Sequence, residues 1–173
     1  MAWLVLVYRL PPKPPSLRSL VHRKLTGAGA VYLTSACAAA PAGPAERVMR
    51  RVRATIATAG GSAVLLRARA LGGGPEIAAA FNAARDRDYE TVIAGCRDAA
   101  AAAETILAAG EFRSGQLPDG DATLKRLDTR YRAAARHDLL GAAKAAHAAA
   151  ALDRYRSMLD LYARCLDAAD SAS

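Results

Sequence analysis

A chain of 173 residues with 53% hydrophobic residues and a net charge of +8 has room for one domain, or for one domain with an appended helical part. Aromatic residues make up only 5%, and much of the apolar content is alanine, so long and closely packed helices are expected. The cysteines Cys37, Cys96 and Cys165 lie far apart and form no CxxC pair, which argues against a disulfide framework and a zinc cluster.

The first ten residues, MAWLVLVYRL, form an apolar run. A membrane-spanning helix needs about 20 such residues, so this run is too short to cross a bilayer. No basic segment precedes it and no small-residue cleavage site follows it, so it does not have the pattern of a signal peptide. We therefore expect a buried strand at about Trp3 to Arg9, in a soluble, cytoplasmic protein without membrane contact.

Four prolines follow this strand and predict a stiff loop. A helix is expected next, with Ser16 as its N-cap and its end near Thr26. From Ala30 to about Ala39 apolar residues alternate, which predicts two short strands joined by a tight bend near Ser35. The inner face of the helix is expected to consist of Leu17, Leu20, Val21 and Leu25.

A second helix is expected from about Ala45 to Ala59, and Ser62 to Arg69 reads as the last strand of this half. The apolar residues on one face of that helix are Val48, Val52, Ile56 and Ala59. The order of elements is then β-α-β-β-α-β, which is the ferredoxin-like pattern.

The glycine-rich segment from Leu71 to Pro75 predicts a hinge, after which the sequence is helical throughout. One helix is expected from Pro75, either continuing to Gly110 or breaking near Gly95. Its candidate core positions are Ile77, Phe81, Ala84, Val92 and Ile106.

A loop at Arg113–Gly120 separates this helix from a second one, capped by Asp121 and ending near Arg136. A third helix is expected from about Ala142 to Ala169. Its apolar residues repeat at intervals of three and four, namely Leu152, Tyr155, Leu159, Tyr162 and Leu166.

The predicted fold class is thus α+β, with a ferredoxin-like βαββαβ half at residues 1–71 and a bundle of about three helices at residues 72–173. We expect the two parts to pack together as one compact unit.

The positive charge is concentrated in the first part of the chain. Residues 1–71 contain eleven Lys and Arg but a single acid, Glu46, whereas residues 72–173 contain thirteen Lys and Arg and fifteen acids. The net charges are therefore +10 and −2. Such an asymmetry predicts a polyanionic partner or an anionic ligand, and the alternative is a solvated basic surface without a partner.

In a ferredoxin-like fold the two helices lie on the same side of the sheet, so their outward faces can merge into one positive surface. Such a surface suits the phosphates of duplex DNA, and arginine also suits small oxyanions; the residues leave both alternatives open. The candidate DNA- or anion-binding residues are Arg9, Lys13, Arg18, Arg23, Lys24, Arg47, Arg50 and Arg51.

Motifs for catalysis are absent from the sequence. It contains no HExxH, GxSxG or P-loop, and Gly72–Gly74 lacks the spacing of a dinucleotide site. The three cysteines fall in predicted apolar faces, where burial suppresses the reactivity of a thiol. We therefore expect a protein that is not an enzyme and that has no cofactor and no metal site.

Two small clusters admit two interpretations each. Asp86, Asp88 and Glu90 are either metal ligands or members of an ion-pair network with the neighbouring arginines, and we favour the network. His137 and Asp138 form an imidazole–carboxylate pair in one interpretation. In the other, which we favour, Asp138 caps the next turn.

Five segments together resemble the N-terminal domain of the chromate-resistance regulator family ChrB. They are WLVLVYRLPPKP at Trp3–Pro14, GAVYL at Gly29–Leu33, GGSAVLLRAR at Gly60–Arg69, AAFNAARDRDYETV at Ala79–Val92 and RHDLLGA at Arg136–Ala142. Thr34 and Leu140 depart from the family's usual residues. The resemblance implies a transcriptional regulator that binds DNA and responds to chromate. Nothing in the chain corresponds to the family's C-terminal domain, so a stand-alone N-terminal domain is expected.

The βαββαβ half also resembles the dimerisation part of PaaX-type regulators and the CRISPR adaptation dimer subunit. This likeness implies a homodimer. In the CRISPR subunit a metal-supporting carboxylate ends the first strand, whereas here Tyr8 and Arg9 stand there, so nuclease activity is not expected. The rival interpretations are an oxyanion-binding protein and an adaptor that docks through its C-terminal helices, both without DNA contact.

Overall fold

The computed structural model describes residues 1–110 and 119–171, within which lie four strands and five helices. The chain divides into two compact units, Met1–Ala84 and Arg85–Ser173, which we call the sheet unit and the helical unit. The boundary lies inside a long helix, beyond the glycine-rich segment at Leu71–Pro75. The expectation that the two parts pack as one compact body stays a prediction.

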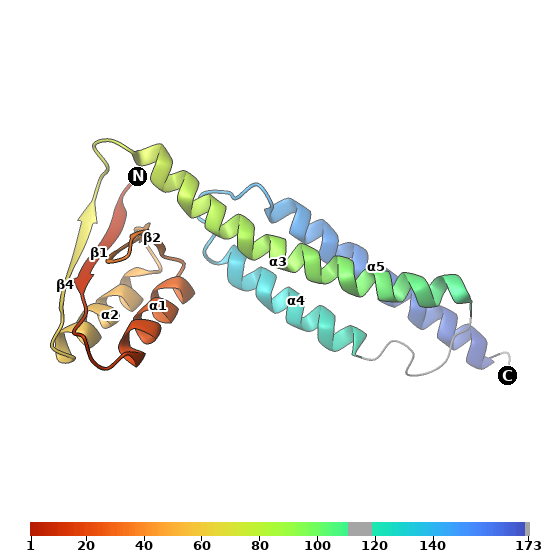
Figure 1. Cartoon of the computed structure of the whole chain (residues 1–173). Helices are drawn as coiled ribbons and strands as arrows, with labels where there is room; N and C mark the ends of the chain where they lie inside the picture. Colours follow the sequence, from red (N-terminus) through yellow and green to blue (C-terminus); the bar gives the residue numbers. More distant parts are fainter. Residues whose placement is uncertain (111–118, 172–173) are drawn as a thin grey trace. The chain divides into compact units, whose positions relative to one another are not determined.

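The sheet unit is built on a four-stranded antiparallel sheet with the strand order β2-β3-β1-β4, so β2 and β4 are its edges (Figure 1). In the register, Leu6 of the central strand pairs with Ala38 on one side and Leu65 on the other. The elements in chain order are β1 (Trp3–Arg9), α1 (Ser16–Gly27), β2 (Val31–Thr34), β3 (Cys37–Pro41), α2 (Glu46–Thr58) and β4 (Ser62–Ala68).

Both α1 and α2 cover the same face of this sheet, because their buried residues share one core with alternate residues of β1. Leu4, Leu6 and Tyr8 point to this core, whereas Val7 on the opposite face is 45% exposed. The helices contribute Leu17, Val21 and Leu25 from α1, and Met49, Val52 and Ile56 from α2.

The predicted elements of this half are confirmed to within a residue or two, including the division of Ala30–Ala39 into two strands. Two details were wrong. Ser16 is the first residue of α1 and not its cap, because Pro15 precedes it in a helical conformation and no side chain caps the helix. Met49, which the spacing missed, is fully buried in α2, whereas Val48 is only partly buried.

The helical unit takes up most of α3 (Gly74–Ala109) together with α4 (Gly120–Ala135) and α5 (Ala145–Ser171). The start of α3 belongs to the sheet unit, where Phe81 contacts Trp3 edge to face with ring centroids 6.3 Å apart. The helix does not break at Gly95. A Cβ atom there would lie 2.6 Å from Cδ2 of Leu127, so the glycine allows α4 to approach α3 closely.

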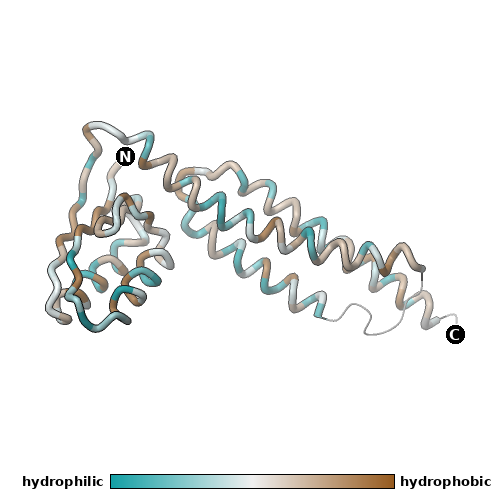
Figure 2. The backbone as a smooth tube through the Cα atoms, viewed as in Figure 1, coloured by the Kyte–Doolittle hydropathy of each residue, from teal (hydrophilic) through white to brown (hydrophobic). Residues whose placement is uncertain are grey.

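One apolar core joins the three helices of this unit. Hydrophilic and hydrophobic residues follow one another along each helix (Figure 2). The members of this core include Tyr89 and Val92 of α3 and Leu127 of α4. The predicted seam of α5 is confirmed for Leu152, Tyr155, Leu159 and Tyr162, which are buried, and Leu166 is partly buried.

Two further predictions concern the helix ends. Asp121 is not the cap of α4, because the helix already begins at Gly120 and Asp119 precedes it. Most of the expected loop at Arg113–Gly120 lies outside the described residues.

Within residues 1–110 and 119–171, each helix is either too short or too polar to cross a bilayer.

Candidate anion-binding surface

All eight predicted cations are exposed in the sheet unit, at the end of β1, on the loop that follows it and on the two helices. In α2 the spacing separates them into two groups. Arg47 and Arg51 are one turn apart on the side opposite the buried Met49, Val52 and Ile56. Arg50 lies on the flank that faces β4.

The two arginines of α1 do not share one side of the helix. Arg18 and Arg23 are five residues apart, which turns their side chains about 140° from each other. His22, one turn after Arg18, stacks on Tyr32 of β2, with ring centroids 5.1 Å apart and planes inclined by 19°. The side of α1 that carries Arg18 therefore lies toward β2.

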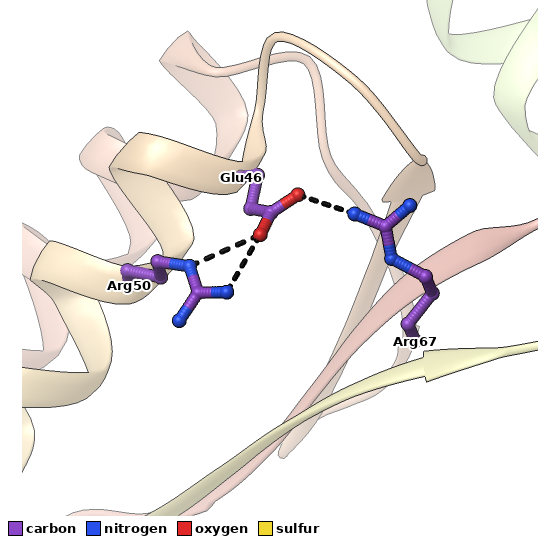
Figure 3. Close-up of polar contacts among 3 residues, drawn as sticks. All are labelled: Glu46, Arg50 and Arg67. Atoms are coloured by element: carbon purple, nitrogen blue, oxygen red, sulfur yellow. Dashed lines mark hydrogen bonds and ion pairs between the residues drawn. The ribbon is translucent and has the colours of Figure 1, made fainter.

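Arg50 belongs to an ion-pair network that is centred on Glu46 (Figure 3). Oε1 of Glu46 accepts hydrogen bonds from Nε of Arg50 at 3.0 Å and from its Nη2 at 2.7 Å. Oε2 of Glu46 accepts one from Nη2 of Arg67, a residue of β4, at 2.7 Å. The hydrogen bonds from Arg50, and then the positive charges of both arginines, hold the pKa of Glu46 below its ordinary value of 4.5.

A groove of about 370 Å³ lies beside this network, between α2 and the free edge strand β4. Arg50, Arg53 and Arg67 line it, together with the β4 residues Ala63 to Leu66. Each guanidinium has five N–H donors, so Arg50 and Arg67 keep donors that Glu46 does not use. This arrangement is able to bind a small anion between three guanidinium groups.

The eight candidate binding residues did not include Arg53 and Arg67. Arg53 follows Arg50 by three residues, and this helical spacing was the available signal. Arg67 had no such signal, because only the packing of α2 on β4 brings it next to Glu46, 21 residues away in the chain.

The other cations of residues 1–71 have no carboxylate partner in the part of the chain that the structure describes. Glu46 is the single acid of residues 1–71 and contacts Arg50 and Arg67. The remaining nine Lys and Arg of this segment make no ion pair with any described residue. The sheet unit therefore presents exposed positive charge that its own fold does not neutralise.

The expected ion pair with a neighbouring arginine is confirmed for Asp88 alone, whereas Glu90 and Asp86 contact Lys144. Oδ2 of Asp88 lies 3.0 Å from Nε of the buried Arg85, and Glu90 pairs with Nζ of Lys144. Oδ1 of Asp86 accepts a hydrogen bond from the backbone N–H of Lys144 at 2.8 Å. In the described part of the chain, no three His, Cys, Asp or Glu side chains gather as a metal site.

Asp138 is a cap, as the sequence indicated. Its Oδ1 accepts hydrogen bonds from the backbone N–H groups of Gly141 and Ala142, both at 2.9 Å. Its Oδ2 accepts one from the hydroxyl of Tyr89 at 3.1 Å. Burial, and then this bond, raise the pKa of Tyr89. Two of the family-like segments, Ala79–Val92 and Arg136–Ala142, thus meet in the helical unit.

Two of the thiols, those of Cys37 and Cys96, are poor nucleophiles. Burial raises the pKa of Cys37 and of Cys96, so both are protonated at neutral pH. Cys37 lies in β3 and Cys96 in the core of the helical unit. The expectations that the protein is not an enzyme and needs no cofactor stay predictions.

Comparison with known protein families gives a match. The family model described as "Protein ChrB, N-terminal" matches residues 18–171. No curated protein and no solved structure matches the chain. The match extends over both units and includes most of α1, all of α2 and the three helices of the helical unit. The chain therefore belongs to the ChrB N-terminal family.

Proposed function

We propose that the chain is a DNA-binding transcriptional regulator of the chromate-resistance type to which the ChrB family belongs. The sheet unit contacts the phosphate backbone of duplex DNA. Membership of the family supports the regulatory part of this proposal. The exposed positive charge of the sheet unit supports the DNA contact.

The observation that carries the proposal is the set of nine cations in residues 1–71 without a carboxylate partner among the described residues. A fold that needs ion pairs for its own stability places acids next to its bases. Here the charges remain available for an external anion, and neutralising several phosphates releases the counterions of DNA.

Arg47 and Arg51 form the centre of the proposed contact. They lie one turn apart on the outer side of α2, and both are exposed. Their planar guanidinium groups suit the oxygens of a phosphate. The element order and the strand order β2-β3-β1-β4 support a ferredoxin-like assignment for this unit, and the shared core of α3, α4 and α5 supports a three-helix bundle.

A test is the double variant Arg47→Gln/Arg51→Gln, measured by fluorescence anisotropy with a 25-base-pair duplex of random sequence at several salt concentrations. We expect weaker binding and a salt slope lower by about two units, because two phosphate contacts are lost. The matched control is Arg97→Gln/Arg164→Gln, which removes the same charge from exposed positions of α3 and α5. An unchanged slope in the first variant would contradict the proposed contact.

A second candidate function is the binding of a small oxyanion without DNA contact, and the groove between α2 and β4 favours it. Arg50, Arg53 and Arg67 line this groove, and Glu46 holds two of them. Isothermal titration with chromate and with sulfate tests this function. Two results together would favour this function over the first proposal. The wild-type protein would bind an oxyanion but no duplex DNA, and the variant Arg53→Gln/Arg67→Gln would lose the oxyanion.

A further inference from the structure

In the helical unit, the cations of α3 and α5 mostly have carboxylate partners. Arg154 of α5 donates to Glu104 of α3 at 3.0 Å, Arg156 pairs with Asp153 at 2.6 Å, and Arg97 pairs with its neighbour Asp98 at 3.2 Å. These pairs neutralise charge within the unit.

The region of α4 differs from its two neighbours. It carries five cations between residues 125 and 136, and only Arg132 has a carboxylate partner among the described residues, Asp128 at 2.8 Å. The other four, which make no ion pair with any described side chain, are Lys125, Arg126, Arg130 and Arg136. Exposed unpaired charge is therefore concentrated on one of the three helices.

Three of these cations lie along one side of the helix. Lys125, Arg132 and Arg136 are at positions i, i+7 and i+11, with Thr129 between them at i+4. This side is opposite Leu127 and Ala134, which are buried in the core. The four residues line one open hollow on the surface and span about 16 Å along the helix. We call them the α4 stripe.

The composition of the α4 stripe decides which partner it fits. A protein interface has apolar or aromatic side chains at its centre, and a membrane-bound helix turns an apolar side to the lipid. In α4 no large apolar side chain is exposed, and Leu127 lies in the core. Lysine, arginine and threonine are instead the side chains that contact phosphate oxygens of DNA.

Arg132 remains able to contact a phosphate although it has an ion pair. Its Nε contacts Asp128, which fixes the guanidinium on the stripe and leaves the N–H groups of both terminal nitrogens for an anion. Asp128 therefore acts as a positioning residue for Arg132.

We propose that the α4 stripe is a second contact surface for the phosphate backbone of duplex DNA, with Lys125, Arg132 and Arg136 as the phosphate contacts. This inference rests on the proposed function and extends it to a helix outside the basic N-terminal half. Because the contacts are to phosphates, they strengthen binding to all sequences alike.

The test is the variant Lys125→Gln/Arg132→Gln/Arg136→Gln, measured with the random 25-base-pair duplex across a salt series. We expect affinity to fall roughly tenfold or more and the salt slope to fall by about two to three units. The variant Lys125→Gln/Arg136→Gln keeps the Arg132–Asp128 pair and serves if the triple variant loses helical circular dichroism. The matched control is Arg97→Gln/Arg156→Gln/Arg164→Gln, which removes the same charge from α3 and α5.

The outcomes separate this inference from the proposed function. If the stripe variants bind like the wild type while Arg47→Gln/Arg51→Gln binds weakly, the inference is wrong and the proposed function stands. If the stripe and control variants lose affinity equally, net charge and not the stripe is responsible, and the inference is again wrong. If the wild-type protein binds no duplex even at low salt, the proposed function fails and the inference fails with it.

Discussion

The two units of this protein use charged side chains in different ways. In the sheet unit, one acid faces eleven cations in residues 1–71, and most of the charge has no partner within the described fold. In the helical unit, carboxylates hold the fold together. Asp138 and Asp86 accept hydrogen bonds from backbone N–H groups, and Glu104 links α3 to Arg154 of α5.

This difference separates charges that build a fold from charges that are available to a partner. Removing a carboxylate that satisfies backbone N–H groups leaves these donors without an acceptor, so it lowers stability. Removing an exposed, unpaired arginine leaves no such defect, so stability changes little and binding changes instead. The predictions below test this comparison, from the largest expected effect to the smallest.

The largest effect is expected from the cores, which do not depend on charge. Leu6 is completely buried between the sheet and the two helices of the sheet unit. Leu6→Ala should lower the free energy of unfolding by about 3 kcal/mol, because it leaves a cavity. Urea unfolding measures this loss, and hydrogen exchange assigns it to the sheet unit. The matched variant Leu152→Ala should instead lower the protection of backbone amides from hydrogen exchange in the helical unit. If both variants lowered this protection in the same unit, the prediction would be contradicted.

Two glycines distinguish rigid from adjustable packing in the two units. A Cβ atom at Gly61 would lie 2.6 Å from the carbonyl oxygen of Arg9 and 2.8 Å from Cγ2 of Ile56. At Gly95 it would meet the tip of Leu127, which is able to turn away. Gly61→Ala should therefore destabilise the protein by about 3 kcal/mol.

Gly95→Ala should lower the free energy of unfolding by about 1 kcal/mol or less, because the higher helix propensity of alanine offsets part of the strain. Thermal unfolding of the two variants measures the difference. Equal destabilisation would mean that the contact with Leu127 is as rigid as the contact with the backbone of Arg9.

At Asp138 in the helical unit we expect a loss of stability smaller than that of Gly61→Ala and larger than that of Gly95→Ala. Asp138→Ala should lower the free energy of unfolding by about 2 kcal/mol, because two backbone N–H groups and the Tyr89 hydroxyl lose their acceptor. Asp138→Asn should restore part of it through its amide oxygen. The control Asp153→Ala removes an exposed ion pair with Arg156 and should change stability by less than about 0.5 kcal/mol. Similar losses in the two alanine variants would rule out the cap as the cause.

The smallest change in stability is expected at Glu46 in the sheet unit, where binding should change instead. Glu46→Gln removes the only carboxylate of residues 1–71 and releases Arg50 and Arg67. We expect stability near neutral pH to change little and affinity for duplex DNA to rise, which fluorescence anisotropy measures. A weaker affinity would show instead that Glu46 is needed to position the two arginines.

The pH dependence of the same ion pairs has a definite sign. Because the folded pKa of Glu46 lies below its ordinary value of 4.5, the network stabilises the fold above the pKa of the unfolded carboxyl. This stabilisation is lost as the pH falls through the lower, folded pKa. The small difference in stability between the wild type and Glu46→Gln should therefore vanish in acid, and a difference that grows with acidity would contradict the assignment.

The sequence by itself determined the order of the elements and where the positive charge lies. Alternation and apolar runs locate Trp3–Arg9, the two strands within Ala30–Ala39 and the last strand, because side-chain periodicity is a local property. The same holds for the seam from Leu152 to Tyr162 in α5. Asp138 as a cap also followed from the sequence, since a capping carboxylate acts on N–H groups three and four residues away.

Only the tertiary structure decided which charges meet. Arg50 is tied to Glu46, and Arg67, absent from the sequence-based candidates, joins the same network from β4. Tyr89 contacts Asp138 across 49 residues, and Gly95, which does not interrupt α3, leaves room for Leu127 of α4. These contacts depend on how distant segments pack, and a periodic pattern specifies the inner face of each element but not the neighbour that covers it.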